Sequence, residues 1–303
     1  MPTIQSLHWY PVKSCAGLSV EQLRFGKSGP CHDRSWMLVD DDARYLTART
    51  LPHMLRLLPV VRDGLLLLRV PVEGSAPELL ELAALDTDAP ANPVLLEPRS
   101  LSKQRLEVSI WGDSCAAVVA DDTVNTILSN FLGTSVRLVF MAADTVRPVE
   151  QDYIDRTALA GQTFQVGFAD AYQALVIGQA SLDILNQKMA QALPMSRFRP
   201  NIVVSGSEPF AEDSWHRIES DGVVLYGVKK CSRCAITTVD PDTGSRGKEP
   251  LKTLATFRRG ERGIMFGQNL VYSTPYEDGR TQTLVCGAEL NVVSHLPDSG
   301  EGY

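Results

Sequence analysis

A long series of short apolar runs, separated by turn residues, constrains the fold of this chain more than any other feature. The run Trp36–Val39 is followed by the turn Asp40-Asp41-Asp42, after which Arg44–Thr47 can return as a partner strand. Residues Arg105–Ile110 alternate polar and apolar side chains with a period of two, which is typical of a half-buried strand. Many short strands at such spacing predict a barrel or a sandwich.

Helical periodicity first appears near residue 120. Asp121 or Asp122 can cap a helix that ends at Gly133. A second helix is expected to begin at Ser181, to carry Leu182, Leu185, Met189 and Leu193, and to stop before Pro194. We therefore expect an α+β fold that is mainly β with a few helices. A chain of 303 residues suits about two domains, and we expect them over residues 1–120 and 121–303.

Composition excludes several classes of protein. Lys and Arg total 29 and Asp and Glu total 36, so the formal net charge is −7. This acidic balance argues against a nonspecific partner such as a nucleic-acid polymer or an anionic membrane. The apolar runs are far too short to span a bilayer, and the N-terminus lacks the regions of a secretory signal. Six cysteines are too few for a disulfide scaffold, so we expect a cytoplasmic protein.

The closely spaced pair Cys231 and Cys234 is the first feature that points to chemistry. Structural zinc would need a second ligand pair, and the other cysteines and the histidines are isolated in the sequence. A thioredoxin-like motif would precede a helix, whereas residues 235–239 are expected to be extended. Two interpretations remain open: small residues at a turn between strands, or a single thiolate that binds a soft metal.

Several basic and polar residues lie on predicted turns. Lys13 and Ser14 follow a proline, and a lysine, a hydroxyl and backbone N–H groups can together hold a phosphate. Arg34 and Arg199 each precede a predicted strand, and Asn201 lies beside the second of them. Arginine is suited to bidentate contact with phosphate. Each position taken alone is more typical of a solvated surface charge than of an anion site, and the spacing does not show that they converge.

Five strings of residues, taken together, resemble the MOSC-domain family. They are YPVKS at residues 10–14, DRSW at 33–36, RFRPN at 197–201, CSRC at 231–234 and TTVDPDTG at 237–244. They occur in order across nearly the whole chain. The likeness extends to the mitochondrial amidoxime-reducing components and their bacterial counterparts.

The resemblance implies a MOSC β-barrel and an N-terminal β-rich MOSC-N domain. It also implies a molybdenum–molybdopterin cofactor, with Cys234 as the metal ligand and catalytic residue. The cofactor-binding residues that it implies are Lys13, Ser14, Arg34, Arg199, Asn201, Ser232, Arg233 and Cys234. Lys13, Arg34 and Arg199 would form one pocket for the anionic cofactor, so the N-terminal residues are expected to contribute to it.

The activity implied is the reduction of small N-hydroxylated compounds, such as amidoximes and N-hydroxylated bases, to amidines or amines. The overall reaction is R–NHOH + 2e⁻ + 2H⁺ → R–NH₂ + H₂O. The chain has no plant-type cysteine run for a [2Fe–2S] cluster. We therefore expect a separate electron donor resembling a ferredoxin, a cytochrome b5 or a flavoprotein reductase. The alternatives are a non-catalytic cofactor carrier or sulfur-transfer module and, less favoured, a thiol–disulfide protein.

Two departures from the family pattern leave the substrate pocket open. Ala171 and Tyr172 stand where the family often has hydroxylic residues after the aspartate that matches Asp170. Asn269 stands where the eukaryotic relatives carry tyrosine. Cys231 is expected to be structural, because one thiolate suffices for the metal.

Overall fold

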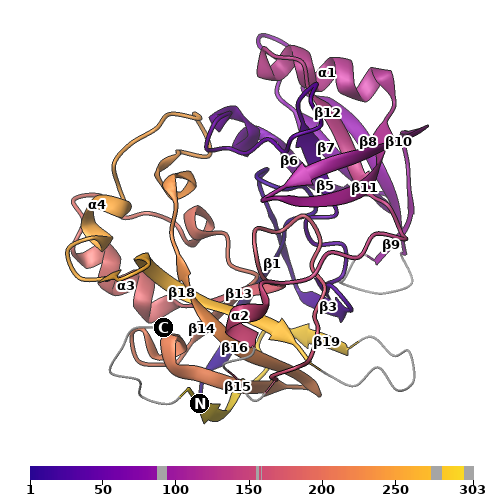
Figure 1. The fold of residues 1–303 in the computed structure, drawn as a ribbon. Helices are drawn as coiled ribbons and strands as arrows, with labels where there is room; N and C mark the ends of the chain where they lie inside the picture. Colours follow the sequence, from indigo (N-terminus) through magenta and orange to yellow (C-terminus); the bar gives the residue numbers. More distant parts are fainter. Residues whose placement is uncertain (87–93, 155–156, 158, 274–281, 297–303) are drawn as a thin grey trace.

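The computed structural model describes residues 1–86, 94–154, 157, 159–273 and 282–296 (Figure 1). Strands dominate and only short helices accompany them, which confirms a mainly β, α+β fold. The helices are α1 (Asp122–Leu132), α2 (Gln151–Ile154), α3 (Gln179–Gln187) and α4 (Leu251–Leu254), with 3-10 helices η1 (Pro52–Arg56), η2 (Met195–Phe198), η3 (Ala211–Ser214) and η4 (Ala235–Thr238).

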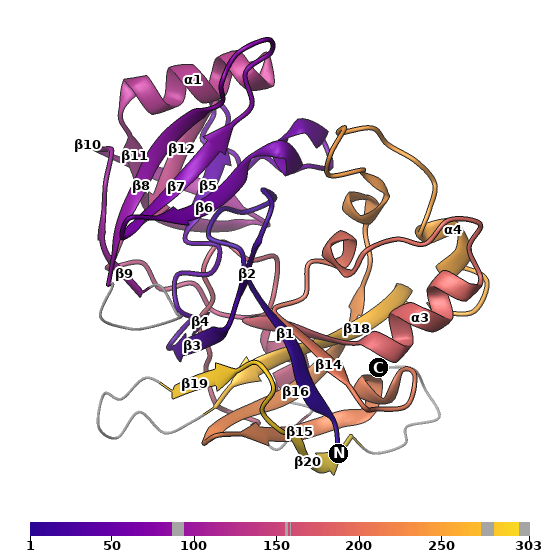
Figure 2. The same cartoon turned by 180° about the vertical axis from the view of Figure 1, so that it is seen from behind.

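One nine-stranded sheet occupies the half of the molecule that contains the N-terminus (Figures 1 and 2). Its strands run in the order β2 (Leu18–Val20), β1 (Thr3–Trp9), β14 (Ile202–Ser205), β13 (Ala174–Gly178), β18 (Gly263–Tyr272), β16 (Val223–Ser232), β15 (Trp215–Ser220) and β20 (Asn291–His295), and β17 (Arg259–Gly260) pairs with β18. Because β1 pairs with β14, the first residues of the chain lie beside a strand from its last third.

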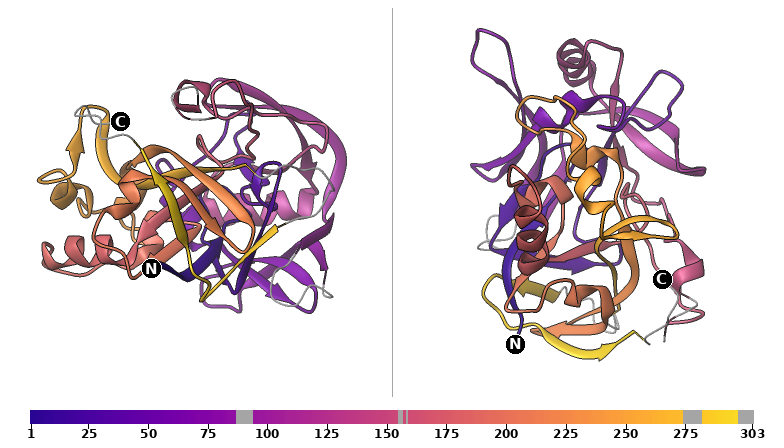
Figure 3. Two further views of the ribbon diagram at one scale, coloured as in Figure 1. Left: turned by 90° about the horizontal axis from the view of Figure 1, so that it is seen from below. Right: turned by 90° about the vertical axis from the view of Figure 1, so that its left-hand side faces the viewer.

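Two four-stranded sheets and α1 form the opposite end of the molecule (Figure 3, right). The first contains β10 (Leu101–Ile110), β11 (Asp113–Ala120), β12 (Arg137–Met141) and β5 (Trp36–Val39), and the second contains β6 (Leu58–Arg62), β7 (Leu65–Val70), β8 (Glu78–Asp86) and β9 (Val94–Pro98). A smaller sheet joins β19 (Gln282–Val285), β3 (Gln22–Gly26) and β4 (Gly29–Pro30).

The helix α1 has the caps that its sequence predicts. Asp121 is the N-cap and its carboxylate accepts the N–H of Val124 at 2.9 Å, while Gly133 ends the helix in the left-handed conformation. The pairing of β11 with β12 joins strands on either side of residue 120. This strand pairing therefore crosses the predicted domain boundary at residue 120. The division into residues 1–120 and 121–303 stays a prediction.

The predicted start of the second helix is wrong. Helix α3 begins at Gln179 rather than Ser181, and it ends at Gln187, so Met189 and Leu193 lie beyond it. Ser181 lies inside the helix and is fully buried, where its hydroxyl donates to the Glu212 carboxylate at 2.9 Å and accepts the N–H of Phe210 at 2.7 Å. This tertiary contact satisfies the serine side chain, which therefore does not cap the helix.

Candidate functional site

All eight residues predicted for the site line one cavity of about 250 Å³. They come from the turn after β1, the segment before β5, the junction of η2 with β14, and the end of β16. The pairing of β1 with β14 explains how Lys13 and Ser14 come to lie near Arg199 and Asn201. The sequence placed these residues on separate turns, and the sheet brings the turns together.

Three of these residues have a backbone conformation that L-residues rarely adopt. The φ angles of Ser14, Arg34 and Arg199 are +62°, +49° and +57°. Such conformations are unfavourable for residues other than glycine, and they cluster at functional sites where the surrounding structure enforces them. Of the ten non-glycine residues with positive φ in the described chain, these three line the cavity that the sequence motifs predict.

The ring of Tyr10 organises the two arginines. The guanidinium carbons of Arg34 and Arg199 lie 4.4 and 4.5 Å from the centroid of this buried ring. A guanidinium over an aromatic face is attracted by the ring quadrupole. Gly17 packs against the ring so closely that a Cβ atom there would lie 2.3 Å from Cε1 of Tyr10. Tyr10 of the first motif and Gly17, three residues after that motif, thus set the spacing of two cations.

Arg34 is held by several acceptors and carries a costly buried charge. Its guanidinium donates to the carboxylate of Asp33, to Oδ1 of Asn201 at 3.1 Å and to the carbonyl of Arg199 at 3.4 Å. Burial, together with repulsion from Arg199, lowers the pKa of Arg34 to about 9. Burial also lowers the pKa of Arg199. A bound anion would offset the cost of these buried cations.

Asn201 connects the pocket to the strands behind it. In addition to Arg34, its side-chain oxygen accepts the N–H of Leu175 at 3.3 Å, and its side-chain amide donates to the carbonyl of His8 at 3.2 Å. The residue is 1% exposed. These contacts orient Arg34, so the structure gives Asn201 a positioning role.

Lys13, a buried residue, forms an ion pair with Asp170 that sequence reasoning missed. Its ammonium group donates to the Phe168 carbonyl at 2.8 Å and to the Asp170 carboxylate. Burial lowers the pKa of Lys13, and Asp170 offsets part of this effect. Burial alone would raise the pKa of Asp170, but the Lys13 ammonium outweighs it and holds that pKa well below its usual range. Because 157 residues separate the partners, no local signal reveals the pair.

The two cysteines of the CSRC string have different surroundings. The guanidinium of Arg233 donates to Sγ of Cys231 at 2.9 Å and to the carbonyl of Phe198 at 2.6 Å. Cys234 is partly exposed and lines the cavity, and no residue in the described part of the chain forms a hydrogen bond with its sulfur. Cys231 also lines the cavity, but its sulfur already accepts a hydrogen bond, so the thiol of Cys234 is the one left free for a ligand.

The expectation of an extended segment after Cys234 is wrong. Residues Ala235–Thr238 form the 3-10 helix η4, with Cys234 at its N-cap. The hydroxyls of Thr237 and Thr238 donate to carbonyls three residues earlier, at 3.0 and 2.8 Å. These local bonds compete with an extended backbone and offset the β-propensity of the two threonines.

The residues at the departures from the family pattern also line the cavity. They are Ala171, Tyr172 and Asn269, and Lys229 lies among them. The hydroxyl of Tyr172 and the ammonium of Lys229 both donate to one oxygen of Glu150, at 3.1 and 3.0 Å. Burial raises the pKa of Tyr172, and the Glu150 charge raises it further. On this wall of the cavity, Tyr172 and Lys229 are thus both hydrogen-bonded to the carboxylate of Glu150, which is partly exposed to solvent.

Comparison with known proteins places the chain among its relatives. The MOSC N-terminal beta barrel domain matches residues 1–135, and the MOSC domain matches residues 163–290. The chain is 34% identical over 264 residues to mitochondrial amidoxime-reducing component 1 of Mus musculus, and the match covers 84% of this chain and 71% of the relative. The chain belongs to the MOSC-domain family.

Two further relatives show how broad this MOSC family is. Mitochondrial amidoxime-reducing component 1 of Homo sapiens is 32% identical over 90% of this chain and 79% of the relative. Molybdenum cofactor sulfurase of Oryza sativa subsp. japonica is 29% identical over 98% of this chain but only 36% of the relative. The MOSC chain therefore spans about a third of the sulfurase.

The side chains of this MOSC protein fit a metal whose ligands come mostly from a bound organic cofactor rather than from the protein. Among the residues that the structure describes, no three His, Cys, Asp or Glu side chains gather as metal ligands. A metal on Cys234 would therefore depend on an organic cofactor for its other ligands. The buried Nε of Arg233 has no hydrogen-bond partner, which leaves a donor free in the wall of the cavity. No described helix is long and apolar enough to cross a membrane.

Proposed function

We propose that this MOSC protein is a molybdenum-cofactor-dependent oxidoreductase that reduces small N-hydroxylated compounds. One observation carries the proposal: Lys13, Arg34 and Arg199 surround the same cavity as the accessible thiol of Cys234. This arrangement suits a cofactor with an anionic group at one end and a metal at the other. We place the reaction in the cytoplasm, with electrons from a separate donor protein.

In this proposal the three cations hold the phosphate of molybdopterin. The guanidinium groups supply charge-assisted hydrogen bonds, which are shorter and stronger than neutral ones. Ser14 and Ser232 lie along the cavity wall and would orient the pterin by their hydroxyl groups. Arg233 would donate a further hydrogen bond from its Nε, which has no partner in the described part of the chain. Asn201 would act indirectly, because its side chain already binds Arg34.

Cys234 would hold the molybdenum by a thiolate, a soft ligand that suits this metal. When bound, the cofactor would supply the two electrons that cleave the N–O bond of the substrate. Tyr172 and Lys229 line the same cavity and would orient the N-hydroxyl group by hydrogen bonds. The reaction consumes two protons, and the Glu150 carboxylate behind them would connect this wall with solvent.

A second candidate function is a cofactor carrier or sulfur-transfer module. The observation that favours it is the match of almost the whole chain to a part of molybdenum cofactor sulfurase. The carrier would use the same cations and the same thiol, without turnover. The two functions therefore differ in chemistry rather than in the site.

One experiment separates these functions. The protein is purified from a host that makes molybdopterin, its molybdenum and pterin content is measured, and reduced viologen is supplied with benzamidoxime. Bound molybdenum with turnover supports the reductase. Bound molybdenum without turnover on a panel of N-hydroxylated bases supports the carrier. A protein without molybdenum, whose two cysteines cycle with a disulfide reductant, would overturn both.

A further inference from the structure

Five exposed cations gather in one short segment beside the candidate cofactor site. We call them the basic rim, and they are Arg246, Lys248, Lys252, Arg259 and Arg262. None of them forms an ion pair with any residue in the described part of the chain. This concentration of unpaired positive charge is unexpected in a chain whose net charge is −7.

The acidic residues of the same segment do little to neutralise the basic rim. Glu249 is partly buried and its carboxylate accepts the N–H of Thr253 at 3.0 Å. Glu261 is the one exposed carboxylate between positions 246 and 262. Arg258 is not part of the rim because it pairs with Asp213 at 2.6 Å. Arg246 donates to the carbonyl of Arg49 and Arg262 lies over the ring of Tyr153 at 5.2 Å, but neither contact neutralises the charge. The five exposed cations therefore have a single exposed carboxylate, that of Glu261, among them.

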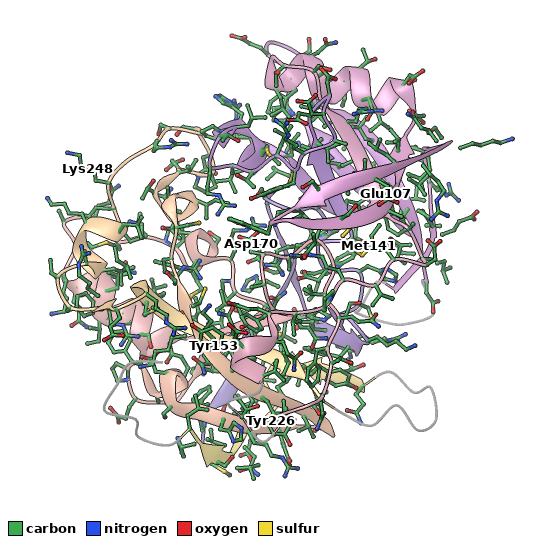
Figure 4. All side chains as sticks on the ribbon, in the orientation of Figure 1. Glu107, Met141, Tyr153, Asp170, Tyr226 and Lys248 are labelled. Carbon is green, nitrogen blue, oxygen red and sulfur yellow. The ribbon has the colours of Figure 1, made fainter. Side chains whose placement is uncertain are left out.

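Backbone contacts fix the basic rim beside Cys234. The N–H of Gly247 donates to the carbonyl of Thr238 in η4 at 2.9 Å. The carbonyl of Arg262 accepts the hydroxyl of Ser232, two residues before Cys234, at 3.2 Å. Figure 4 shows Lys248 at the outer edge of the molecule, whereas Asp170, which lines the cavity, lies toward the middle. The rim thus borders the cysteine side of the site and faces outward.

We propose that the basic rim is the docking surface for an acidic electron-transfer protein. The inference rests on the proposed function, in which two reduced one-electron carriers are each oxidised once for every substrate molecule reduced. Clustered exposed charges create a potential that guides an oppositely charged partner and raises its association rate by about 10 to 1,000-fold at low salt. The rim places that potential beside the thiol proposed to hold the metal.

An anionic membrane is the other macromolecule that a basic surface can bind, and the structure favours it less. Helices that bind at a membrane interface combine basic residues with exposed apolar side chains that enter the lipid. None of the exposed large hydrophobic residues of the described chain lies between positions 246 and 262. The rim therefore suits a charged protein surface better than a lipid surface.

The test compares two triple variants with the same change in net charge. The rim variant carries Lys248→Glu, Lys252→Glu and Arg259→Glu, whose side chains form no hydrogen bond or ion pair within the described part of the chain and do not line the cavity. The control variant carries Lys27→Glu, Arg69→Glu and Lys103→Glu, three exposed cations in the N-terminal part of the chain and outside the cavity lining. Turnover of benzamidoxime by the molybdenum-loaded protein is measured with reduced viologen and with a reduced acidic [2Fe–2S] ferredoxin.

We expect the rim variant to lose at least about tenfold in kcat/KM for the ferredoxin at low salt, and the control variant to lose much less. Added salt should reduce the difference, because it screens exposed charges. Viologen-supported turnover should be the same for the two variants. Equal losses in both variants with ferredoxin, or no loss in either, would overturn the docking proposal while leaving the proposed function intact.

If the wild-type protein shows no turnover even with viologen, the proposed function fails and the docking surface is tested by binding alone. Sedimentation with the acidic ferredoxin should then detect a complex that the rim variant weakens and the control does not. Binding of the wild-type protein to vesicles of phosphatidylserine and phosphatidylcholine, lost in the rim variant, without any ferredoxin complex would assign the rim to a membrane and overturn the proposal.

Discussion

Replacing Gly17 with alanine should disturb the cation site without touching a charged residue. The new Cβ would lie 2.3, 2.5 and 2.9 Å from three atoms of the Tyr10 ring, whereas ordinary contacts are 3.4–4 Å. The ring must therefore move by about 1 Å. It has little room to do so, because both arginine guanidinium groups lie within 4.5 Å of its centroid.

The size of the effect follows from two opposing contributions. Overpacking of this kind costs about 1–3 kcal/mol. Gly17 does not have a positive φ, so alanine fits the backbone and gains about 0.4–1 kcal/mol by reducing the freedom of the unfolded chain. The net loss in the free energy of unfolding is about 1–2 kcal/mol, which corresponds to a decrease in Tm of a few degrees.

Thermal denaturation measures the stability, and the molybdenum content after purification measures the anion site. Gly247→Ala is the matched control, because Gly247 has no positive φ and its nearest atom would lie 3.7 Å from the new Cβ. We expect this control to be neutral or slightly stabilising. The decisive comparison repeats Gly17→Ala in a Tyr10→Ala background. An undiminished cost there would refute the reasoning, because the clash would no longer exist.

Three further predictions concern the thiols, the Lys13–Asp170 ion pair and the wall of the cavity. Cys234→Ser should abolish turnover and strongly reduce bound molybdenum, whereas Cys231→Ser should largely retain both; the reverse pattern, read by metal analysis, would contradict the assignment of the ligand. The pKa of Asp170 is held below its ordinary value of about 3.9, so its ion pair stabilises the native state above that pH and the contribution is lost as the pH falls further. Asp170→Asn should therefore lower the free energy of unfolding at pH 7 and make that free energy less sensitive to pH between pH 4 and pH 2, as followed by chemical denaturation at each pH. An unchanged dependence of stability on acid pH would show that the ion pair contributes nothing. Tyr172→Phe removes the hydroxyl that donates to Glu150 and should raise KM for benzamidoxime several-fold with unchanged molybdenum content, and an unchanged KM would exclude the hydroxyl from substrate binding.

Several elements of this MOSC protein are encoded by neighbouring residues and were predictable for that reason. The caps of α1 depend on Asp121 and Gly133, each of which acts within a few residues. The strand at Trp36–Val39 matches its apolar run without an error. The turn at Asp240 forms because its carboxylate accepts the N–H groups of Asp242 and Thr243, both at 3.0 Å.

Other elements depend on contacts outside their own sequence pattern, and for these the pattern predicts the wrong structure. Ser181 has the residue type of a cap, but it binds the carboxylate of Glu212 and the backbone of Phe210 instead. The segment after Cys234 has β-branched residues, yet it forms η4, where Gly247 binds the carbonyl of Thr238. At Ser181 a tertiary contact outweighs the local propensity. At η4 the hydroxyl bonds of Thr237 and Thr238 to carbonyls three residues earlier also offset their β-propensity.

The residues of the candidate site were predictable by type, and their convergence was not. The sequence by itself determined which residues carry charge, thiol and turn chemistry, because these properties belong to single side chains and their neighbours. Only the tertiary structure decided that β1 pairs with β14, that Tyr10 lies beside both Arg34 and Arg199, and that Lys13 meets Asp170. The physical reason is that such contacts join parts of the chain far apart in sequence, and a short window of residues contains no record of the pairing that brings them together.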